Sequence, residues 1–466
     1  MQCRRRCWRM CVRFSELDGA RIGVWGAGRE IAAFADQLAR RLPAARIVVA
    51  AFDAQPPSDV LDTLRAPAAR VVSGADVVAA LAECEVVVRS PGVSIHRPEM
   101  LALREAGVLV TTATSLWLCE RGGGGVIGVT GTKGKSTTAA LVSHLARAAG
   151  KTAQLAGNIG VPALDLLDAE RAQVTVVELS SFHIADLRMG PEVALVTNLF
   201  REHADWHGSE ETYRAEKLRI LELAGVRVGV INARDAQLMG DVAASAAGAR
   251  PEGPIETRVF GAPAGWDVLD GGIALAGALV ATGSELPLRG EHNALNLCGA
   301  LTALEALAVA LPPLPASLSG FAPLSHRLEL VLERDGVLWV NDSISTTPES
   351  TLAALASFRG REIVLIGGGQ DRGQDYAQLG AALAAGATTV IGVPSTGARL
   401  LAAARDAGAP DARALAAADM LEAVTLAREL ARPGAVVLLS PAAPSYDHYR
   451  DFEQRGERFG ELAARL

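Results

Sequence analysis

The chain has 466 residues, a formal net charge of −7 and a hydrophobic fraction of 50%. This length predicts more than one domain, and the composition is typical of an α/β protein, not of a disordered or fibrous one. The acidic charge balance disfavours nucleic acid or an anionic membrane as a partner. The sequence has no apolar run long enough to span a membrane, and residues 1–14 lack the apolar run of a signal peptide. We therefore expect no membrane insertion and a cytoplasmic location.

The cysteines give little sign of a structural role. There are six, and none forms a metal-type CxxC pair, so we expect a reducing compartment without a disulfide framework. Cys3, Cys7 and Cys11 repeat every four residues among arginines. A metal site is one interpretation of that spacing, and an N-terminal extension without a fold of its own is the favoured one.

Strand and helix patterns alternate in the first part of the chain. Apolar runs predict buried strands at 21–25, 46–51 and 85–89, and a helix at 29–42 lies between the first two. This alternation predicts a parallel sheet that binds its ligand at the carboxyl ends of the strands. The turn Gly26-x-Gly28 lacks the third glycine of the dinucleotide fingerprint, so a nucleotide-binding turn and a plain strand-to-helix turn both remain open.

The same alternation restarts twice. After the glycine run at 122–125, strands are predicted at 126–130, 174–178 and 193–197, and a helix follows Asn296. Past Ala322-Pro323, further strands are predicted at 337–340, 363–366, 389–393 and 435–439. We predict an α/β protein of three domains: an N-terminal Rossmann-like domain, a central P-loop ATPase-like domain with a parallel sheet, and a C-terminal Rossmann-like domain. The expected bounds are 14–113, 114–323 and 324–466.

The most specific motif is GTKGKST, directly after the strand at 126–130. A strand, a glycine-rich turn and a helix whose first amides face a phosphate are the parts of a P-loop. Lys135 would reach the β- and γ-phosphates of ATP, and the Ser136 hydroxyl would face Mg²⁺. Val129 stands where the general pattern has its first glycine, so a glycine loop without a nucleotide is the alternative. The predicted phosphate-binding residues are Gly131, Thr132, Lys133, Gly134, Lys135, Ser136 and Thr137.

Polar residues follow the next two strands. Glu178 ends the strand at 174–178, where a carboxylate beside the P-loop strand is well placed to hold Mg²⁺. A buried structural glutamate is the alternative, although an unpaired carboxylate inside a sheet is costly. Polar residues also crowd the stretch 198–207, and Lys217 lies in a helical pattern beyond it. Taken alone, these two features indicate only a polar surface loop and a solvated helix face.

Taken together, the motifs resemble those of the Mur ligases of peptidoglycan synthesis. They follow the family's order from about residue 90 to 459: GTKGKST, GNIG, ELSSFH, EHADWHG, YRAEK, GEHNALN, SHR, NDS and LLSPAAPS. Within the family, GGGQDRGQDY and FEQRGERF are similar to the glutamate-adding member. The resemblance implies an ATP-dependent ligase that joins glutamate to UDP-N-acetylmuramoyl-L-alanine through an acyl phosphate and releases ADP and phosphate.

The resemblance also implies roles for individual residues. Those implied for catalysis are Lys135, His203 and Lys217, with Lys217 carbamylated. Those implied to hold two Mg²⁺ ions are Ser136, Glu178, His203 and Lys217. The ATP contacts outside the P-loop are Asn296, Arg327 and Asp342. The UDP-sugar contacts are Ser90, Gly92 and Asn158, the glutamate contacts are Arg372, Ser445 and Phe452, and Thr346 is a further substrate contact.

Two departures bear on the substrate. Ile344 stands where D-glutamate ligases usually carry a lysine, and losing a cation beside an anionic substrate changes how that substrate is held. The stretches EHADWHG and NDSISTTPES are more similar to the branch that adds L-glutamate and leaves the stereochemical inversion to a separate epimerase. We therefore expect L-glutamate, with D-glutamate as the alternative and a folylpolyglutamate synthase-like ligase as a remoter one. Asp53 falls where D-glutamate ligases carry polar residues beside uracil, so the uridine contacts are not assigned.

Overall fold

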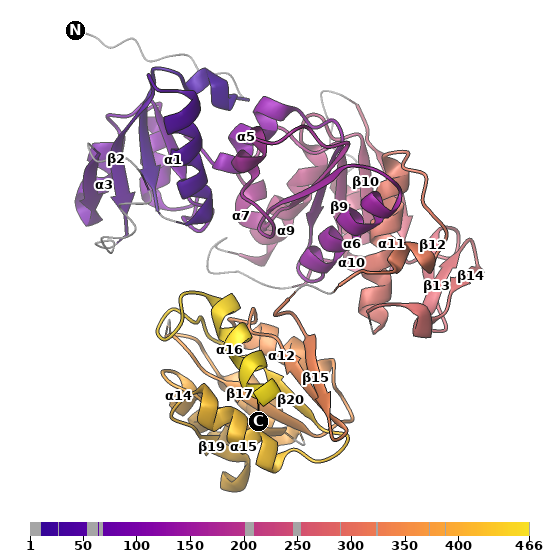
Figure 1. Cartoon of the computed structure of the whole chain (residues 1–466). Helices are drawn as coiled ribbons and strands as arrows, with labels where there is room; N and C mark the ends of the chain where they lie inside the picture. The colour runs from indigo at the N-terminus through magenta and orange to yellow at the C-terminus, as the bar shows by residue number, and fades with distance from the viewer. Residues whose placement is uncertain are drawn as a thin grey trace. The chain divides into compact units, whose positions relative to one another are not determined.

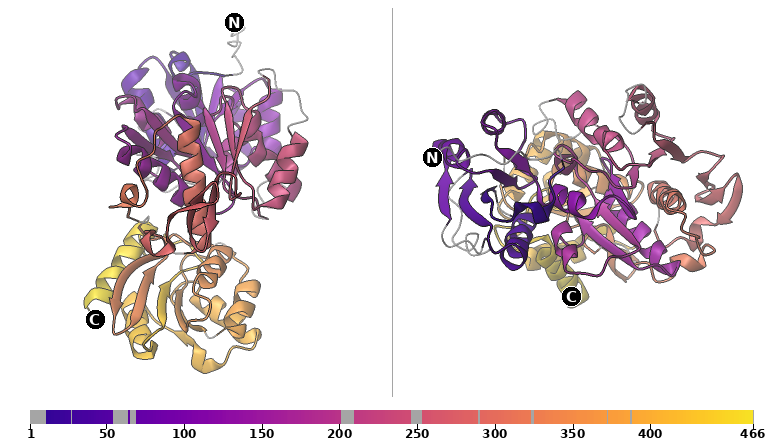
Figure 2. Two further views of the ribbon diagram at one scale, coloured as in Figure 1. Left: turned by 90° about the vertical axis from the view of Figure 1, so that its right-hand side faces the viewer. Right: turned by 90° about the horizontal axis from the view of Figure 1, so that it is seen from above.

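The computed structural model describes residues 11–26, 28–53, 64, 69–200, 209–245, 253–288, 290–322, 325–371, 373–386 and 388–465. By its internal contacts the chain divides into two compact units, Met1–Phe321 and Ala322–Leu466. Figure 1 shows the elements of both. Figure 2 shows the same elements from two further sides. The strand pairings give three large sheets, which are parallel except for one pair of strands in the third.

The first sheet is built from the amino-terminal part of the chain. Its five strands run parallel in the order β3-β2-β1-β4-β5. Its strands and helices are β1 (Arg21–Trp25), α1 (Arg29–Arg41), β2 (Arg46–Phe52), β3 (Arg70–Ser73), α3 (Val77–Leu81), β4 (Val86–Arg89), α4 (Pro98–Glu105) and β5 (Leu109–Thr111). Strand β1 has neighbours on both sides and four of its five residues are buried, as expected where helices cover both faces of a parallel sheet.

The second sheet holds the P-loop. Its six strands are also all parallel, in the order β11-β10-β9-β6-β8-β7. Its strands are β6 (Val126–Thr130), β7 (Ala153–Gly157), β8 (Val174–Glu178), β9 (Val193–Val196), β10 (Val228–Asn232) and β11 (Glu256–Phe260). Its helices are α6 (Lys135–Ala148), α7 (Ser181–Ile184), α9 (Glu210–Leu218), α10 (Ala236–Ser245) and α11 (Glu291–Ala306). A small antiparallel sheet of β12 (Trp266–Leu269), β13 (Gly272–Leu275) and β14 (Ala278–Ala281) precedes α11.

Alternate residues of the central strands face two different layers of helices. In β9, Val193 and Leu195 belong to the core shared with α6 and α11, whereas Ala194 and Val196 belong to the core on the other face. That second core continues into the first sheet through α5 (Ala113–Arg121), whose Trp117 is 1% exposed. The continuous core explains why the first two sheets form one compact unit. The predicted boundary between residues 113 and 114 falls within α5 and stays a prediction, as does that between 323 and 324.

The second unit has a single sheet in the order β15-β16-β20-β17-β18-β19, antiparallel only between β15 and β16. Its strands are β15 (Glu329–Arg334), β16 (Val337–Asn341), β17 (Ile363–Gly367), β18 (Thr388–Gly392), β19 (Ala414–Ala416) and β20 (Val436–Leu439). Its helices are α12 (Pro348–Ala356), α13 (Ala377–Ala385), α14 (Gly397–Asp406), α15 (Met420–Leu430) and α16 (Phe452–Arg465). Side chains of α15 and α16 pack on one face, and those of α12, α13 and α14 pack on the other.

The predicted fold class is confirmed, and the predicted strands match observed ones to within a residue at each end. The helix expected after Asn296 begins five residues earlier, at Glu291. Several short strands were not predicted, namely β3, β5, β7, β10 to β15 and β19. Of the helices in the described parts of the chain, none combines the length and apolarity needed to cross a bilayer.

The expectation of unpaired cysteines is wrong for one pair. Cys11 and Cys119 form a disulfide that joins the segment before the first strand to α5. The same segment is held to α5 by the backbone N–H and hydroxyl of Ser15, which donate to Glu120 Oε2 at 2.9 and 2.8 Å. Spacing along the sequence could not reveal a pair that is 108 residues apart. Cys3 and Cys7 lie outside the described residues.

Candidate active site

The P-loop has the expected strand, turn and helix, from β6 through residues 131–134 to α6. Gly131 has a φ of 140°, and a Cβ there would lie 2.0 Å from Thr197 Oγ1. Gly134 has a φ of 80°, and a Cβ there would lie 2.3 Å from Asn296 Oδ1. Both positions therefore require glycine, because of the backbone conformation and because of the lack of space.

The loop is held from the neighbouring strand β9 and the residues after it. The backbone N–H of Thr132 donates to the Asn198 carbonyl, and that of Lys133 donates to Asn198 Oδ1, both at 2.8 Å. Thr197 Oγ1 donates to the Lys133 carbonyl at 2.6 Å. Asn198 lies in the polar stretch noted in the sequence but was assigned no role there. The contacts of Asn198, which follows the neighbouring strand β9, hold the backbone of the P-loop in place.

The basic and hydroxyl groups of the loop lie where the motif predicts. Lys135 and Ser136 are the first two residues of α6, with Ser136 buried and Lys135 Nζ 2.8 Å from the Thr132 carbonyl. Asn296, predicted as an ATP contact, is buried on α11 against Gly134. The structure therefore brings Asn296 next to the predicted phosphate-binding residues, although α11 begins about 160 residues after the loop.

Glu178 lies at the carboxyl end of β8, paired in register with Val129 of the P-loop strand. Its side chain is 1% exposed. Asn158 Nδ2 donates to Glu178 Oε1 at 3.1 Å, whereas Oε2 is buried without a hydrogen-bond partner. A buried carboxylate with an open oxygen is costly unless a cation or a donor meets it, so the site suits a Mg²⁺ ion.

Lys217 lies on α9 and is 2% exposed. Its Nζ donates to the Gly131 carbonyl at 2.6 Å and lies 5.0 Å from the centre of the Tyr213 ring. The sequence alone indicated a solvated helix face here, and that interpretation is wrong. The amine is buried against the P-loop. His203, predicted beside it as a metal ligand, lies outside the described residues, and no group of three or more His, Cys, Asp or Glu side chains forms a metal cluster among the described ones.

Ser90 and Gly92 lie in the turn after β4, and the turn is organised by Arg89, which the sequence analysis missed. The Arg89 side chain is fully buried, and its Nη1 donates to the carbonyls of Ser90, Pro91 and Val93 at 3.3, 3.0 and 2.9 Å. Asp186, just after α7, pairs with Arg89 Nε at 2.5 Å. An arginine at the end of a buried strand, directly before Ser-Pro-Gly, is the signal that could have found it.

In the second unit, Asp342 follows β16 and is 3% exposed. The backbone N–H of Leu328 donates to one carboxylate oxygen at 3.2 Å, and Ser440 Oγ donates to the other at 2.8 Å. Burial raises the pKa of Asp342 to about 6, although hydrogen bonds from Ser345 and Ser440 and the charge of Arg327 act to lower it. Asp342 and Arg327 are therefore near enough for their charges to interact.

Of the other predicted substrate contacts, those in described parts of this unit lie on two loops and at the start of a helix. Thr346 is half-buried between β16 and α12, Ser445 is buried after β20, and Phe452 opens α16. Arg372 lies outside the described residues. The loops are joined by Arg455, which the sequence analysis missed: its guanidinium donates to Ser343 Oγ, the Ser343 carbonyl and the Ala443 carbonyl at 3.0, 2.8 and 3.0 Å.

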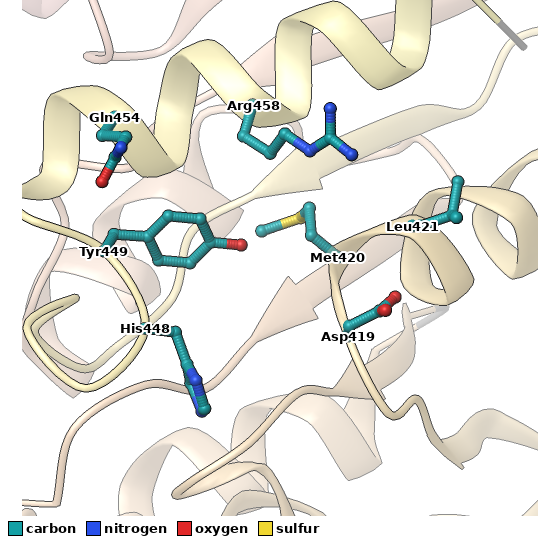
Figure 3. A pocket seen from close by; sticks show the side chains of 7 residues that line it. All are labelled: Asp419, Met420, Leu421, His448, Tyr449, Gln454 and Arg458. Atoms are coloured by element: carbon teal, nitrogen blue, oxygen red, sulfur yellow. The ribbon is translucent and has the colours of Figure 1, made fainter.

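A cavity of about 320 Å³ adjoins these loops (Figure 3). The Ser445 carbonyl accepts hydrogen bonds from the backbone N–H groups of His448 and Tyr449, and both side chains line the cavity. The lining residues are Asp419, Met420, Leu421, His448, Tyr449, Gln454 and Arg458. Of the predicted contacts in the described part of the chain, Thr346, Ser445 and Phe452 are not among them.

Comparisons with known proteins agree with this arrangement. Two family models match the chain: the Mur ligase middle domain at residues 129–304 and the Mur ligase glutamate ligase domain at residues 326–443. A UDP-N-acetylmuramoyl-L-alanine--L-glutamate ligase of a Micromonospora strain is 42% identical over 462 residues, covering 97% of this chain and 98% of the relative. The protein of the same name from Xanthomonas euvesicatoria is 39% identical over 466 residues, with 97% of each covered.

Among solved structures, the MurF ligase of Thermotoga maritima in complex with ADP is similar with a TM-score of 0.57 at 17% identity, covering 98% of this chain and 99% of that one. This likeness concerns the fold alone. The identity of about 40% over nearly the whole chain is far higher and confirms the resemblance found in the motifs. The chain therefore belongs to the Mur ligase family.

Proposed function

We propose that this protein is an ATP-dependent ligase that joins L-glutamate to UDP-N-acetylmuramoyl-L-alanine in the synthesis of peptidoglycan precursors, with release of ADP and phosphate. The observation that carries the proposal is the identity of 42% over 97% of the chain to a relative of that name. The P-loop, the buried Glu178 and the buried Lys217 support it, because they gather at one sheet edge the groups that phosphoryl transfer requires.

ATP would lie with its phosphates on the P-loop. The first amides of α6 point at the position that a phosphate occupies in such loops, and Lys135 supplies a cation beside them. The residues proposed to bind the phosphates are those of the run 131–137. Asn296 is proposed to contact the adenine side, while Arg327 and Asp342 of the second unit are proposed as further nucleotide contacts. The ADP in the Thermotoga maritima MurF structure supports a nucleotide in this fold.

The donor groups fit Mg²⁺. Ser136 offers a hydroxyl at the start of α6, and Glu178 offers a buried carboxylate oxygen without a partner. We propose these two as ligands of one ion, and His203 and Lys217 as ligands of a second. When bound, Mg²⁺ places positive charge against the oxygens of the phosphoryl group in transfer.

Lys217 would serve as a ligand only after reaction with CO₂. Its neutral ε-amine would form an N–C bond to the carbon of CO₂ and release one proton, leaving an anionic carbamate. The buried position of Nζ, 2.6 Å from the Gly131 carbonyl, supports this step, because an ammonium there would repel a metal ion beside the P-loop, whereas a carbamate would offer it oxygen ligands.

The reaction would proceed through an acyl phosphate. The alanyl carboxylate of the UDP-sugar substrate attacks the γ-phosphorus of ATP, ADP leaves, and the neutral amine of glutamate then attacks the acyl carbon. The tetrahedral intermediate expels phosphate. Ser90, Gly92 and Asn158 are proposed to hold the UDP-sugar, and Thr346, Arg372, Ser445 and Phe452 to hold glutamate. The acyl phosphate must be kept from water until the amine attacks it.

The handedness of the glutamate is tested by assaying its two enantiomers separately. Purified protein is mixed with ATP, Mg²⁺, UDP-N-acetylmuramoyl-L-alanine and either isomer, and phosphate release and product mass are measured. We expect L-glutamate to turn over and D-glutamate to react at least about tenfold more slowly, the discrimination that one misplaced polar contact produces. Preference for D-glutamate would overturn the stereochemical assignment, and no phosphate release with either isomer would overturn the ligase itself.

Two consequences belong to this proposal. If L-glutamate is the substrate, a separate epimerase must act on the product before a D-glutamyl residue can appear in the wall precursor. The reaction is placed in the cytoplasm, where ATP is available. A folylpolyglutamate synthase-like activity is disfavoured, because the relatives that match 97% of the chain are named for a UDP-sugar substrate.

A further inference from the structure

A buried polar bridge joins the first sheet's helix α1 to the turn after Glu178. It consists of Glu30, the second residue of α1, His183 in α7, and Ser180, which precedes α7. Figure 1 labels both helices. His183 Nε2 lies 2.6 Å from Glu30 Oε1, and His183 Nδ1 lies 2.6 Å from Ser180 Oγ. The His183 side chain is 4% exposed and that of Glu30 is 11% exposed, so the bridge is nearly shut off from water.

The hydrogen bonds assign the ring proton of His183. The backbone N–H of Ser180 points at Nδ1 from 3.2 Å, and an N–H group can only donate. Nδ1 must therefore accept, which leaves the proton of the neutral ring on Nε2, where it is donated to Glu30. Thr114 Oγ1 donates to the same oxygen of Glu30 at 2.9 Å. The donors of the bridge thus meet acceptors at Glu30 Oε1 and His183 Nδ1, whereas Glu30 Oε2 is buried without a hydrogen-bond partner among the described residues.

The same end of α1 also reaches the other side of Glu178. Arg29 donates to the carbonyls of Asn158 and Gly160, both at 3.0 Å. Asn158 in turn donates its amide to Glu178 Oε1. Ser180 stands two residues after Glu178 along the chain. Arg29 and Glu30, directly after the Gly26-x-Gly28 turn, therefore hold the segments on both sides of the carboxylate that we propose binds Mg²⁺.

We propose that Glu30 and His183 are positioning residues, which set the place of Ser180 and Glu178 relative to the turn of the first sheet that receives the UDP-sugar substrate. This inference rests on the proposed function, because it concerns the alignment of that substrate with the phosphoryl-transfer site. None of the three bridge residues is among those proposed above to contact a substrate. It acts by fixing two segments, from different sheets, whose misplacement by about 1 Å costs on the order of 100-fold in rate.

A purely cohesive role would not need these residue types. Burying a carboxylate and an imidazole costs free energy that their mutual hydrogen bond only partly offsets, and an apolar pair of similar volume would hold two domains at least as firmly. A polar bridge instead specifies one geometry, because its hydrogen bonds are made only at one separation and orientation.

Matched substitutions at residue 183 separate capping from bridging. His183 is the third residue of a capping box with Ser180, a position that glutamine and glutamate both serve well. His183→Gln keeps the cap and can also donate to Glu30. His183→Glu keeps the cap but places a second carboxylate against Glu30. The double variant Glu30→Gln/His183→Glu restores a donor and an acceptor with the polarity reversed.

The experiment measures kcat and KM for ATP and for UDP-N-acetylmuramoyl-L-alanine in the wild type and the three variants, with melting temperatures as the check on folding. We expect His183→Glu to lower kcat about 100-fold with the KM for ATP changed less than about threefold. His183→Gln should stay within about threefold of the wild type in kcat, and the double variant should recover at least about tenfold over His183→Glu.

Two results for the variants would overturn the inference. Equal activity of the Gln and Glu variants would show that His183 only caps α7, which overturns the inference. Equal loss in all three variants, without recovery in the double variant, would also overturn it, because the bridge would not be what the activity depends on. A wild-type enzyme inactive with both glutamate isomers would refute the proposed function, and with it this inference, whereas with an active wild type the variants test the bridge alone.

Discussion

Glu178 and Asp342 are both buried carboxylates at the carboxyl ends of parallel strands, one in each unit of the chain, yet their surroundings differ. Glu178 receives one hydrogen bond, from Asn158, and its second oxygen has no partner. Asp342 receives a hydrogen bond on each oxygen, from the backbone N–H of Leu328 and from Ser440. The side chains are 1% and 3% exposed, so water does not explain the difference.

The position of a buried carboxylate at the end of a strand therefore does not by itself assign its role. An open, buried oxygen suits direct contact with a cation, which supports the metal role proposed for Glu178. A carboxylate already met by two donors has fewer free lone pairs and suits a hydroxyl of the ligand, which supports the nucleotide role proposed for Asp342. Four substitutions test this contrast, from the P-loop outward.

The largest effect is expected from Lys135→Ala. The substitution removes the cation beside the phosphates in the unit that holds Glu178, and such groups contribute on the order of 10⁴-fold to phosphoryl transfer. We expect turnover, measured as phosphate release, to fall by about that factor while the melting temperature stays within a few degrees. Lys151→Ala, at the far end of the same helix region, is the matched control and should retain activity. Near-wild-type turnover in Lys135→Ala would show that the loop is misinterpreted.

Glu178→Gln is expected to lower kcat by about 10³-fold and to raise the Mg²⁺ concentration for half-maximal activity at least about tenfold, because an amide is a much weaker ligand for a hard cation. The measurement is a Mg²⁺ titration of the residual rate. Asp342→Asn is the control from the other unit: its activity should fall, but its Mg²⁺ dependence should match the wild type. A shift in both variants, or in neither, would remove the distinction between the two carboxylates.

Local sequence signals predicted the parts of this site that are local in structure. A buried strand, GTKGKST and a helix start are contiguous, so the P-loop and the positions of Lys135 and Ser136 could be inferred without a fold. Buried strands such as β6 and β8 were predicted for the same reason, although β10, which is equally long and fully buried, was missed. The short β12, β13 and β14 were missed because their residues are interrupted by glycine turns and carry exposed apolar side chains, a pattern that alternation alone does not distinguish from a loop.

Contacts between distant segments could not be predicted. The bond from Lys217 to Gly131 spans 86 residues, and the disulfide from Cys11 to Cys119 spans 108. The amphipathic pattern around Lys217 is that of a solvated helix face, since nothing in the local sequence shows that α9 packs on the P-loop. Arg89 and Arg455 were missed for a related reason: most of their partners are backbone carbonyls, which no residue type reveals, and their side-chain partners Asp186 and Ser343 are about 100 residues away along the chain.

Lys217→Ala is expected to lower turnover about 100-fold, because the buried amine and the carbamate proposed on it would both be lost from the P-loop side of the site. Acetate or formate added to the assay should restore a measurable part of that rate by supplying a small carboxylate in the space left by the side chain. The rate is recorded against carboxylate concentration, with sodium chloride at equal ionic strength as the control. An unaffected variant would contradict the role, and a loss without any rescue would argue for the amine itself over the carbamate.

The smallest effect concerns the stability of the second unit. The pKa of Asp342 in the folded protein, about 6, lies above its ordinary value of 3.8, so the folded unit binds this proton more tightly than the unfolded chain does. The contribution to the free energy of unfolding is therefore fully present below pH 3.8 and is lost as the pH rises through 6. From pH 8 to pH 5, the contribution of Asp342 to the free energy of unfolding rises by about 1.4 kcal/mol.

Other carboxyl groups titrate in the opposite direction, such as Asp451, where burial acts to raise the pKa but hydrogen bonds from Gln454 and Arg450 outweigh it. The test is therefore a difference between proteins. Hydrogen exchange of peptides covering β16 and β20, measured in the wild type and in Asp342→Asn at each pH, should show the wild type gaining about 1.4 kcal/mol relative to the variant from pH 8 to pH 5. A constant difference between the two proteins across that range would mean that Asp342 is ionised at its ordinary pKa. Asp342 and Glu178 would then differ only in their hydrogen-bond partners, because burial would not disfavour the ionised form of the Asp342 carboxylate.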